Sequence, residues 1–179
     1  QDYNHTKIQA IPDLSFMKDV YTGLDVLEQM DFSQLKGKTI SILCNQASVN
    51  RNGQHLLALL REVEDVHVLA IFLPQYGLFA SEDPKLKMMG NKSIDPIFGA
   101  RVVDLFKRVM YPPEWSIRDA DLILIDIQDT GVRYTTSMTT VSKVMEKASE
   151  HDKPILLLDR TNPIRGDGMD GPFVRTAYQ

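Results

Sequence analysis

The strongest indication of the fold is a set of four apolar runs, each of which ends in a polar turn. They occupy residues 38–46, 66–77, 121–131 and 154–163. Apolar residues within them are continuous rather than alternating with polar ones, which is typical of strands buried on both faces of a sheet. We therefore expect a mostly parallel sheet that is covered on both sides.

Segments with a helical period separate these runs. Apolar residues recur every three to four positions in segments 53–63, 99–110 and 139–150, so each predicts a helix with one apolar face. Segment 22–30 predicts a further short helix, and segment 111–120 predicts a surface loop. Strands that alternate with helices form βαβ units with right-handed connections. The sequence thus predicts an α/β, Rossmann-like fold, a mostly parallel sheet flanked by helices on both faces.

The chain of 179 residues fits one domain. We expect residues 1–20 to form an N-terminal arm and residues 21–179 to form the Rossmann-like domain. The single cysteine, Cys44, lies inside an apolar run and is expected to be a buried structural thiol. The sequence begins with Gln1 rather than methionine, which fits either a removed export signal or a fragment of a longer protein.

The charge and apolar content exclude two classes of partner. The formal net charge is −4 and no basic patch is present, so a nucleic-acid partner is not expected. No apolar run approaches the roughly 20 residues that a membrane span requires, so no span is expected either.

Polar residues follow all four runs, and a parallel sheet would bring them to one edge, where α/β proteins bind their ligands. They are Asn45 and Gln46, then Gln75 and Tyr76, then Asp126, Gln128, Asp129, Arg133 and Tyr134, and finally Asp159, Arg160 and Asn162. This density of amides, carboxylates and arginines indicates a polar ligand with many hydroxyl groups. The alternative is that these residues only brace loops, because loops after strands are polar in any case.

Neither a cofactor nor a metal is predicted. The turn after the first run reads NQASVNRNG, without the glycine cluster that lets backbone approach a pyrophosphate and without a phosphate-loop lysine. The four histidines are scattered and do not fall at metal-ligand spacing. Asp126 and Asp129 are only a weak signal for Mg²⁺, since two acids on one loop have many other uses.

The acids at the strand ends leave two interpretations open. Asp126 ends an apolar run and is therefore expected to be partly buried, either paired with Arg133 or Arg160 or acting as a functional acid. Asp129 either caps the turn that follows it or acts in the site, and Asp159 is likewise either a loop brace or a catalyst.

Four motifs together resemble a known family. They are LKGKTISILCNQASVNRNG, FLPQYG, DLILIDIQDTGVRYTT and LLLDRTNPIRGDGMDGP, in this order. This combination resembles the NamZ-type exo-β-N-acetylmuramidases, which are glycoside hydrolases formerly known only as a domain of unknown function. The resemblance extends over residues 23–172, most of the chain.

The resemblance implies a Rossmann-like N-terminal domain followed by a second domain, with the active site in the cleft between them. It implies release of terminal N-acetylmuramic acid from peptidoglycan fragments without a nucleotide cofactor, and an exported bacterial protein, periplasmic or extracellular. This chain would then be the N-terminal domain. Its partners would be a carbohydrate that contains N-acetylmuramic acid and the second domain, which lies outside this chain.

The sequence departs from the family pattern at the end of the second run. The family typically carries Pro-Glu-His-Gly there, with the glutamate as the proposed acid/base, whereas this chain reads Pro-Gln75-Tyr76-Gly. Gln75 thus stands at the glutamate position and Tyr76 at the histidine position. The Asn-Gln-Thr-Gly of the first turn is also changed, to Asn-Gln-Ala-Ser, and Asp170 replaces a glutamate.

Three functional hypotheses follow from this departure. In the first, the protein remains a glycosidase, and another carboxylate such as Asp126 or Asp129, or Glu82 or Asp83, supplies the acid. In the second, it is an inactive relative that binds sugars or muropeptides through Asn45, Gln46, Asp126, Gln128, Arg133, Tyr134, Arg160 and Asn162. In the third, the strand-end residues only support loops in a structural domain.

Overall fold

A computed structural model describes residues 20–75, 98–106, 110–168, 170 and 171 of the chain. Five strands form one sheet in the order β3-β2-β1-β4-β5, and every neighbouring pair is parallel. The strands are β1 (Lys38–Cys44), β2 (Val66–Leu73), β3 (Arg101–Asp104), β4 (Leu122–Asp126) and β5 (Ile155–Leu157). The α/β, Rossmann-like fold expected from the sequence is confirmed.

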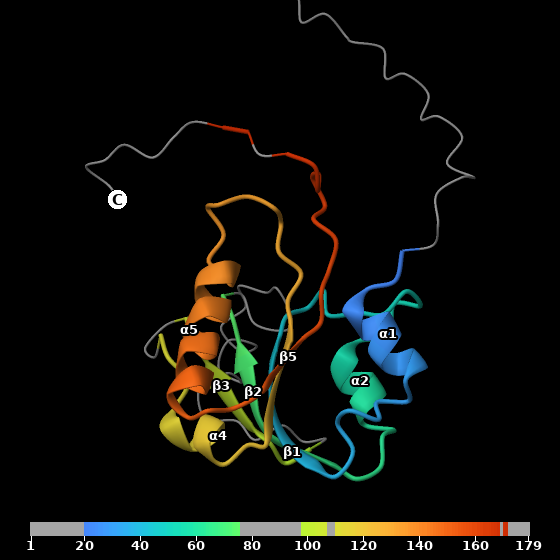
Figure 1. Ribbon diagram of the computed structural model, residues 1–179, viewed down its shortest axis with the longest axis vertical. Coiled ribbons are helices and arrows are strands. Elements are labelled where there is room, and N and C mark those ends of the chain that lie inside the picture. The colour runs from blue at the N-terminus through green and yellow to red at the C-terminus, as the bar shows by residue number, and fades with distance from the viewer. Residues whose placement is uncertain (1–19, 76–97, 107–109, 169, 172–179) are drawn as a thin grey trace, which may run out of the picture.

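Helices cover both faces of this sheet (Figure 1). The described helices are α1 (Gly23–Gln29), α2 (Leu56–Leu60), α4 (Glu114–Arg118) and α5 (Ser137–Glu150). Leu24 of α1 and Leu56 of α2 pack with Ile40 and Ile42 in one apolar core. On the opposite face, α4 and α5 contribute to a second core that includes Leu43, Ile123 and Ile125. Alternate residues of β1 therefore enter different cores, which explains why its sequence is continuously apolar.

The prediction of a helix over 99–110 is wrong at its centre, because residues 101–104 form strand β3. This strand pairs with β2 alone in the sheet order, with Val102 beside Ile71 and Val103 beside Phe72. A short apolar segment does not distinguish a helix from a strand by its period, and β-branched valines favour the strand. The neighbouring prediction of a surface loop is also wrong, since 114–118 forms α4 and buries Ile117 in the second core.

Cys44 ends β1 and is completely buried, as expected for a structural thiol. Burial, followed by the negative charge of Asp126, raises the pKa of this thiol far above its ordinary value. A thiol held in its neutral form is a poor nucleophile.

Within the described ranges, no helix has the length and apolarity needed to cross a membrane.

Candidate functional site

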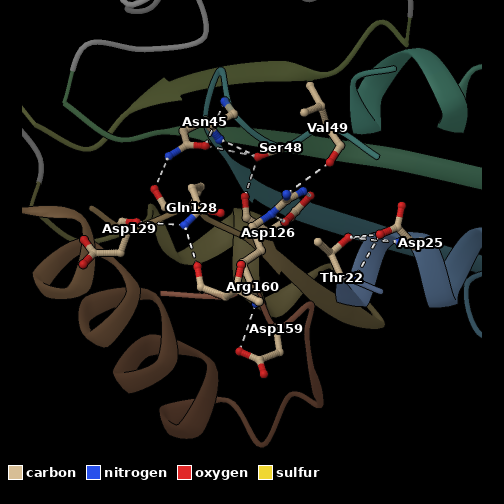
Figure 2. A network of polar contacts seen from close by, with 12 residues as sticks. Thr22, Asp25, Asn45, Ser48, Val49, Asp126, Gln128, Asp129, Asp159 and Arg160 are labelled. Carbon is tan, nitrogen blue, oxygen red and sulfur yellow. Dashed lines mark hydrogen bonds and ion pairs between the residues drawn. The ribbon is translucent and has the colours of Figure 1, made fainter. Parts of the chain in front are cut away.

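The carboxyl ends of β1, β4 and β5 carry an interconnected set of polar side chains, most of which the sequence marks as candidates (Figure 2). Strand β1 lies at the centre of the sheet, where the order of strands reverses: β2 and β3 lie on one side of it and β4 and β5 on the other. In open parallel sheets, the crevice above such a reversal is the usual ligand site.

An ion pair between Asp126 and Arg160 lies at the centre of this set. Asp126 is the last residue of β4 and is fully buried, and the Arg160 side chain is 5% exposed. The guanidinium donates from Nε to Oδ1 and from Nη2 to Oδ2, the second bond being 2.8 Å long. Nη1 donates to the backbone carbonyl of Val49 at 3.1 Å. Arg160 therefore joins the ends of β4 and β5 to the loop after β1.

Burial raises the pKa of the Asp126 carboxyl above its ordinary value, while the hydrogen bonds and charge of Arg160 act in the opposite direction. Removing the carboxylate from water disfavours its charged form, and the bidentate guanidinium restores much of that loss. Arg160, one of the two partners considered for Asp126 in the sequence, contacts it. Both oxygens of this carboxylate are occupied by the contact.

Asn45 and Ser48 connect the loop after β1 to the end of β4. The Asn45 side chain donates from Nδ2 to the carbonyl of Gln128 at 3.0 Å. The Ser48 hydroxyl donates to the backbone carbonyl of Asp126 at 2.6 Å and accepts from the backbone N–H of Asn45 at 2.9 Å. Both side chains are buried. His55 reaches the same loop, with Nε2 2.9 Å from the Asn45 carbonyl.

Gln128 and Asp129 order the loop that follows β4. The Gln128 amide donates to the carbonyls of Asp129 at 2.8 Å and of Thr161 at 3.1 Å, so it links this loop to the segment after β5. Asp129 accepts from the backbone N–H of Gly131 at 2.9 Å and from the Thr135 hydroxyl at 2.8 Å. Asp129 thus closes a turn within its own loop.

Gln75, which the sequence resemblance places at the glutamate position of the family, lies two residues beyond β2 and is half-buried. Its Oε1 accepts a hydrogen bond of 2.8 Å from the hydroxyl of Thr136, which directly precedes α5. The contact connects the end of β2 to the loop after β4, which also contains Gln128 and Asp129. Tyr76 lies outside the described residues, as do Glu82 and Asp83.

The remaining candidates are exposed around the buried network: Gln46, Arg133, Tyr134, Asp159 and Asn162. The side chain of Tyr134 is 85% exposed. Asn162 accepts from the Ile164 N–H at 2.9 Å, and Asp159 accepts from the Arg160 N–H at the same distance. These residues leave polar and aromatic surface at the edge of the sheet where a ligand would approach.

The sequence did not single out Ser48 or Thr136, both of which hold predicted residues in place. For Ser48 the available signal is its position three residues after Asn45, a spacing that suits local side-chain bonds in turns. For Thr136 the signal is its position before a helical segment, where a threonine commonly caps the helix.

No group of three or more His, Cys, Asp or Glu side chains within the described ranges is arranged to hold a metal ion. Neither Gln75 nor Gln128 lines either of two surface hollows. One is bordered by α2 and residues near Phe32, and the other lies between α1 and the end of β5, where it reaches Asp159 and Arg160.

The fold and the strand-end residues define a class: an α/β domain with a cluster of polar side chains where the order of strands reverses. The family described as the N-terminal domain of exo-β-N-acetylmuramidase NamZ matches residues 40–179. The chain therefore belongs to the NamZ N-terminal domain family.

Individual relatives agree with this assignment. The peptidoglycan β-N-acetylmuramidase NamZ of Bacillus subtilis (strain 168) is 33% identical over 159 residues, which are 89% of this chain and 38% of that protein. Crystal structures of two DUF1343 family proteins from Bacteroides fragilis NCTC 9343 match 88% and 90% of the chain. Their TM-scores are 0.75 and 0.70 at 29% and 33% identity, and the matches cover 39% and 40% of those chains. This chain thus spans about two fifths of the length of these relatives.

Proposed function

We propose that this chain is the sugar-binding N-terminal domain of an exo-β-N-acetylmuramidase-type glycoside hydrolase, and that Gln75 impairs its hydrolytic activity. The substrate would be a peptidoglycan fragment with a terminal N-acetylmuramic acid. The observation that carries this proposal is the 33% identity to the Bacillus subtilis β-N-acetylmuramidase across 89% of the chain. The family match over residues 40–179 supports the same substrate class.

The impairment follows from the chemistry of the amide at position 75. A glycosidase protonates the leaving oxygen with a carboxylic acid, commonly one with a raised pKa. A glutamine amide has no such proton and acts only through hydrogen bonds. General acid–base catalysis typically contributes 10²–10⁴-fold to rate, so its loss would leave little activity by that route. Residual activity would then require another acid, with Asp129 as a candidate, or a nucleophile supplied by the 2-acetamido group of the sugar.

Asp126 is a weaker candidate for the missing acid. Its two oxygens accept from Arg160, and the carboxyl is completely buried. Because both oxygens are bonded to Arg160, this buried carboxyl presents no free oxygen from which a proton could pass to a leaving group. We therefore assign Asp126 and Arg160 to the support of the site, together with Asn45 and Gln128.

A binding-only protein is the second candidate, and the Thr136–Gln75 contact favours it. The contact holds an amide, not an acid, at the end of β2. The exposed groups Gln46, Arg133, Tyr134, Asp159 and Asn162 would then provide contacts to sugar hydroxyls. Arg133 suits the lactyl carboxylate of muramic acid, because a guanidinium fork matches a carboxylate in shape and charge.

Further proposals concern the whole protein. The relatives are longer than the part that this chain matches. We propose that a second domain completes the cleft above the strand ends. Export to the periplasm or the cell exterior would bring the protein to peptidoglycan fragments.

Two assays on the full-length protein test the proposed function. Turnover of a chromogenic N-acetylmuramide between pH 4 and 8 measures hydrolysis, and we expect it to be slow. Calorimetry with N-acetylmuramic acid and with N-acetylglucosamine measures recognition, and we expect the former to bind more tightly. A protein that neither hydrolyses the substrate nor distinguishes the two sugars would instead support the structural hypothesis.

A further inference from the structure

Thr136 occupies the position of a helix cap but uses its side chain elsewhere. It is the N-cap residue of α5, a helix of 14 residues, and its side chain makes no capping hydrogen bond to that helix. A threonine at this position ordinarily accepts a bond from one of the first backbone N–H groups. Here the hydroxyl donates to Oε1 of Gln75 at 2.8 Å.

The backbone around Thr136 is fixed independently of Gln75. The Thr136 carbonyl accepts from the N–H of Thr140 at 2.9 Å and from its hydroxyl at 3.1 Å. The hydroxyl of the preceding residue, Thr135, lies 2.8 Å from Oδ1 of Asp129 and 2.9 Å from the Val132 carbonyl oxygen, two acceptors that share its one proton. The Thr136 hydroxyl is therefore a donor at a defined place beside Gln75.

This contact determines which end of the Gln75 amide is available. A primary amide has one carbonyl oxygen and one NH₂ group. The carbonyl oxygen already accepts from Thr136, so the NH₂ group is the donor that this half-buried side chain can offer to a ligand. A glutamate that accepted the same bond would present a second oxygen, which in its ionised form only accepts hydrogen bonds.

We propose that Thr136 is a positioning residue that orients Gln75 so that its Nε2 donates a hydrogen bond to an oxygen atom of the bound sugar. This inference rests on the proposed function, because it takes a sugar as the ligand. If so, glutamine in place of glutamate at position 75 removes an acid and also adds a hydrogen-bond donor. The specificity of the site would then include an acceptor oxygen opposite Gln75.

Calorimetry with N-acetylmuramic acid tests this role in the full-length protein. Thr136→Val keeps the shape of the side chain without the hydroxyl, and we expect it to weaken binding roughly two- to tenfold, the range of one hydrogen bond. Thr136→Ser keeps the hydroxyl and should bind within about twofold of wild type. Ser142→Ala removes an exposed hydroxyl from the same helix, where it bonds to the Met138 carbonyl, and serves as the matched control.

Nuclear magnetic resonance of the side-chain amides reports on Gln75 directly. The Gln75 NH₂ signals, identified by their loss in Gln75→Glu, should shift when N-acetylmuramic acid is added to wild type and shift less in Thr136→Val. Two results would overturn this inference alone. Thr136→Val could bind the sugar as tightly as wild type, or Thr136→Ser could weaken binding as much as Thr136→Val does. Absence of sugar binding by wild type would overturn it together with the proposed function.

Discussion

Arg160 balances the charge of a carboxylate that water does not reach, and this single residue connects three loops of the site. Removing one partner of a buried ion pair leaves the other charge uncompensated, which commonly costs about 3–5 kcal/mol. We therefore expect Arg160→Ala to lower the free energy of unfolding by about that amount, because Asp126 is fully buried. Urea denaturation followed by circular dichroism would measure it.

The matched control is Arg118→Ala, which removes an arginine that pairs with Asp119 at the surface. Both side chains of that pair are about half exposed, and exposed pairs contribute little. Its effect on the free energy of unfolding should be much smaller than that of Arg160→Ala. Equal costs for the two arginine substitutions would contradict the structural role given to Arg160.

Gly131 brings the loop after β4 close to the segment after β5. Its φ is +77°, and a Cβ atom added there would lie 2.2 Å from Oδ1 of Asn162. Gly131→Ala should destabilise the protein by the roughly 1–2 kcal/mol of left-handed backbone strain, plus a smaller cost because the exposed Asn162 side chain must turn away and give up its bond to the Ile164 N–H. Gly53 is the control, because it has the same φ of +77° with nothing within 4 Å of the added atom.

The comparison of the two glycine substitutions by thermal denaturation isolates the contact with Asn162. Gly131→Ala should lower Tm more than Gly53→Ala, and adding Asn162→Ala should recover part of the difference. If both glycine variants melt alike, the close approach of these loops in solution is not supported.

At the scale of elements, α1 depends on an acid in its first turn. Asp25 accepts from the backbone N–H and the hydroxyl of Thr22, and from the N–H of Arg51. Burial acts to raise the pKa of Asp25, but the hydrogen bonds from Arg51 and Thr22 and the charge of Arg51 together lower it below its ordinary value of 3.8. The folded state thus favours the ionised form.

The lowered pKa of Asp25 fixes the sign of a pH effect. Its stabilising contribution is fully present above the unfolded-state pKa and is lost as pH falls through the lower folded-state pKa. Asp25→Ala should cost about 1.5–3 kcal/mol at pH 7, the range for hydrogen bonds to a charged group. Chemical denaturation at pH 7 and at pH 3 should show a smaller difference from wild type at the lower pH.

The exposed acid Glu62 provides the control for this series. Glu62→Ala should remain within about 0.5 kcal/mol of wild type at pH 7, as surface substitutions usually do. A cost for Asp25→Ala that grows as pH falls would show that its carboxylate is not the stabilising form.

The elements also show where sequence patterns suffice. The strands β1, β2, β4 and β5 and the helix α5 were predictable because long apolar runs and a sustained helical period have few alternative structures. Strand β3 was not predictable, because Val102 and Val103 fit the period of a helix as well as that of a strand. Only the pairing of this segment with β2 makes it a strand. Helix α4 was hidden by its shortness and by the prolines before it, and it is stabilised by the burial of Ile117.

For the molecule as a whole, the sequence predicted which polar residues gather at the ends of the strands, but not which of them form hydrogen bonds with one another. Parallel strands place Asn45, Asp126 and Arg160 at one edge by topology alone. Their pairing depends on the lengths and turns of loops, which a local pattern does not encode. Thr136 escaped prediction for the same reason, since its partner Gln75 is 61 positions away in the chain.

We propose that this chain retains a muramidase-type site in which the amide of Gln75 has replaced the acid. Hydrolysis of a chromogenic N-acetylmuramide by the full-length protein and by its Gln75→Glu variant, across pH 4–8, tests it most directly. We expect Gln75→Glu to raise kcat by about 10²-fold or more, the typical contribution of general acid–base catalysis. Wild-type turnover equal to that of Gln75→Glu would contradict the claim, because the acid would then act from another residue.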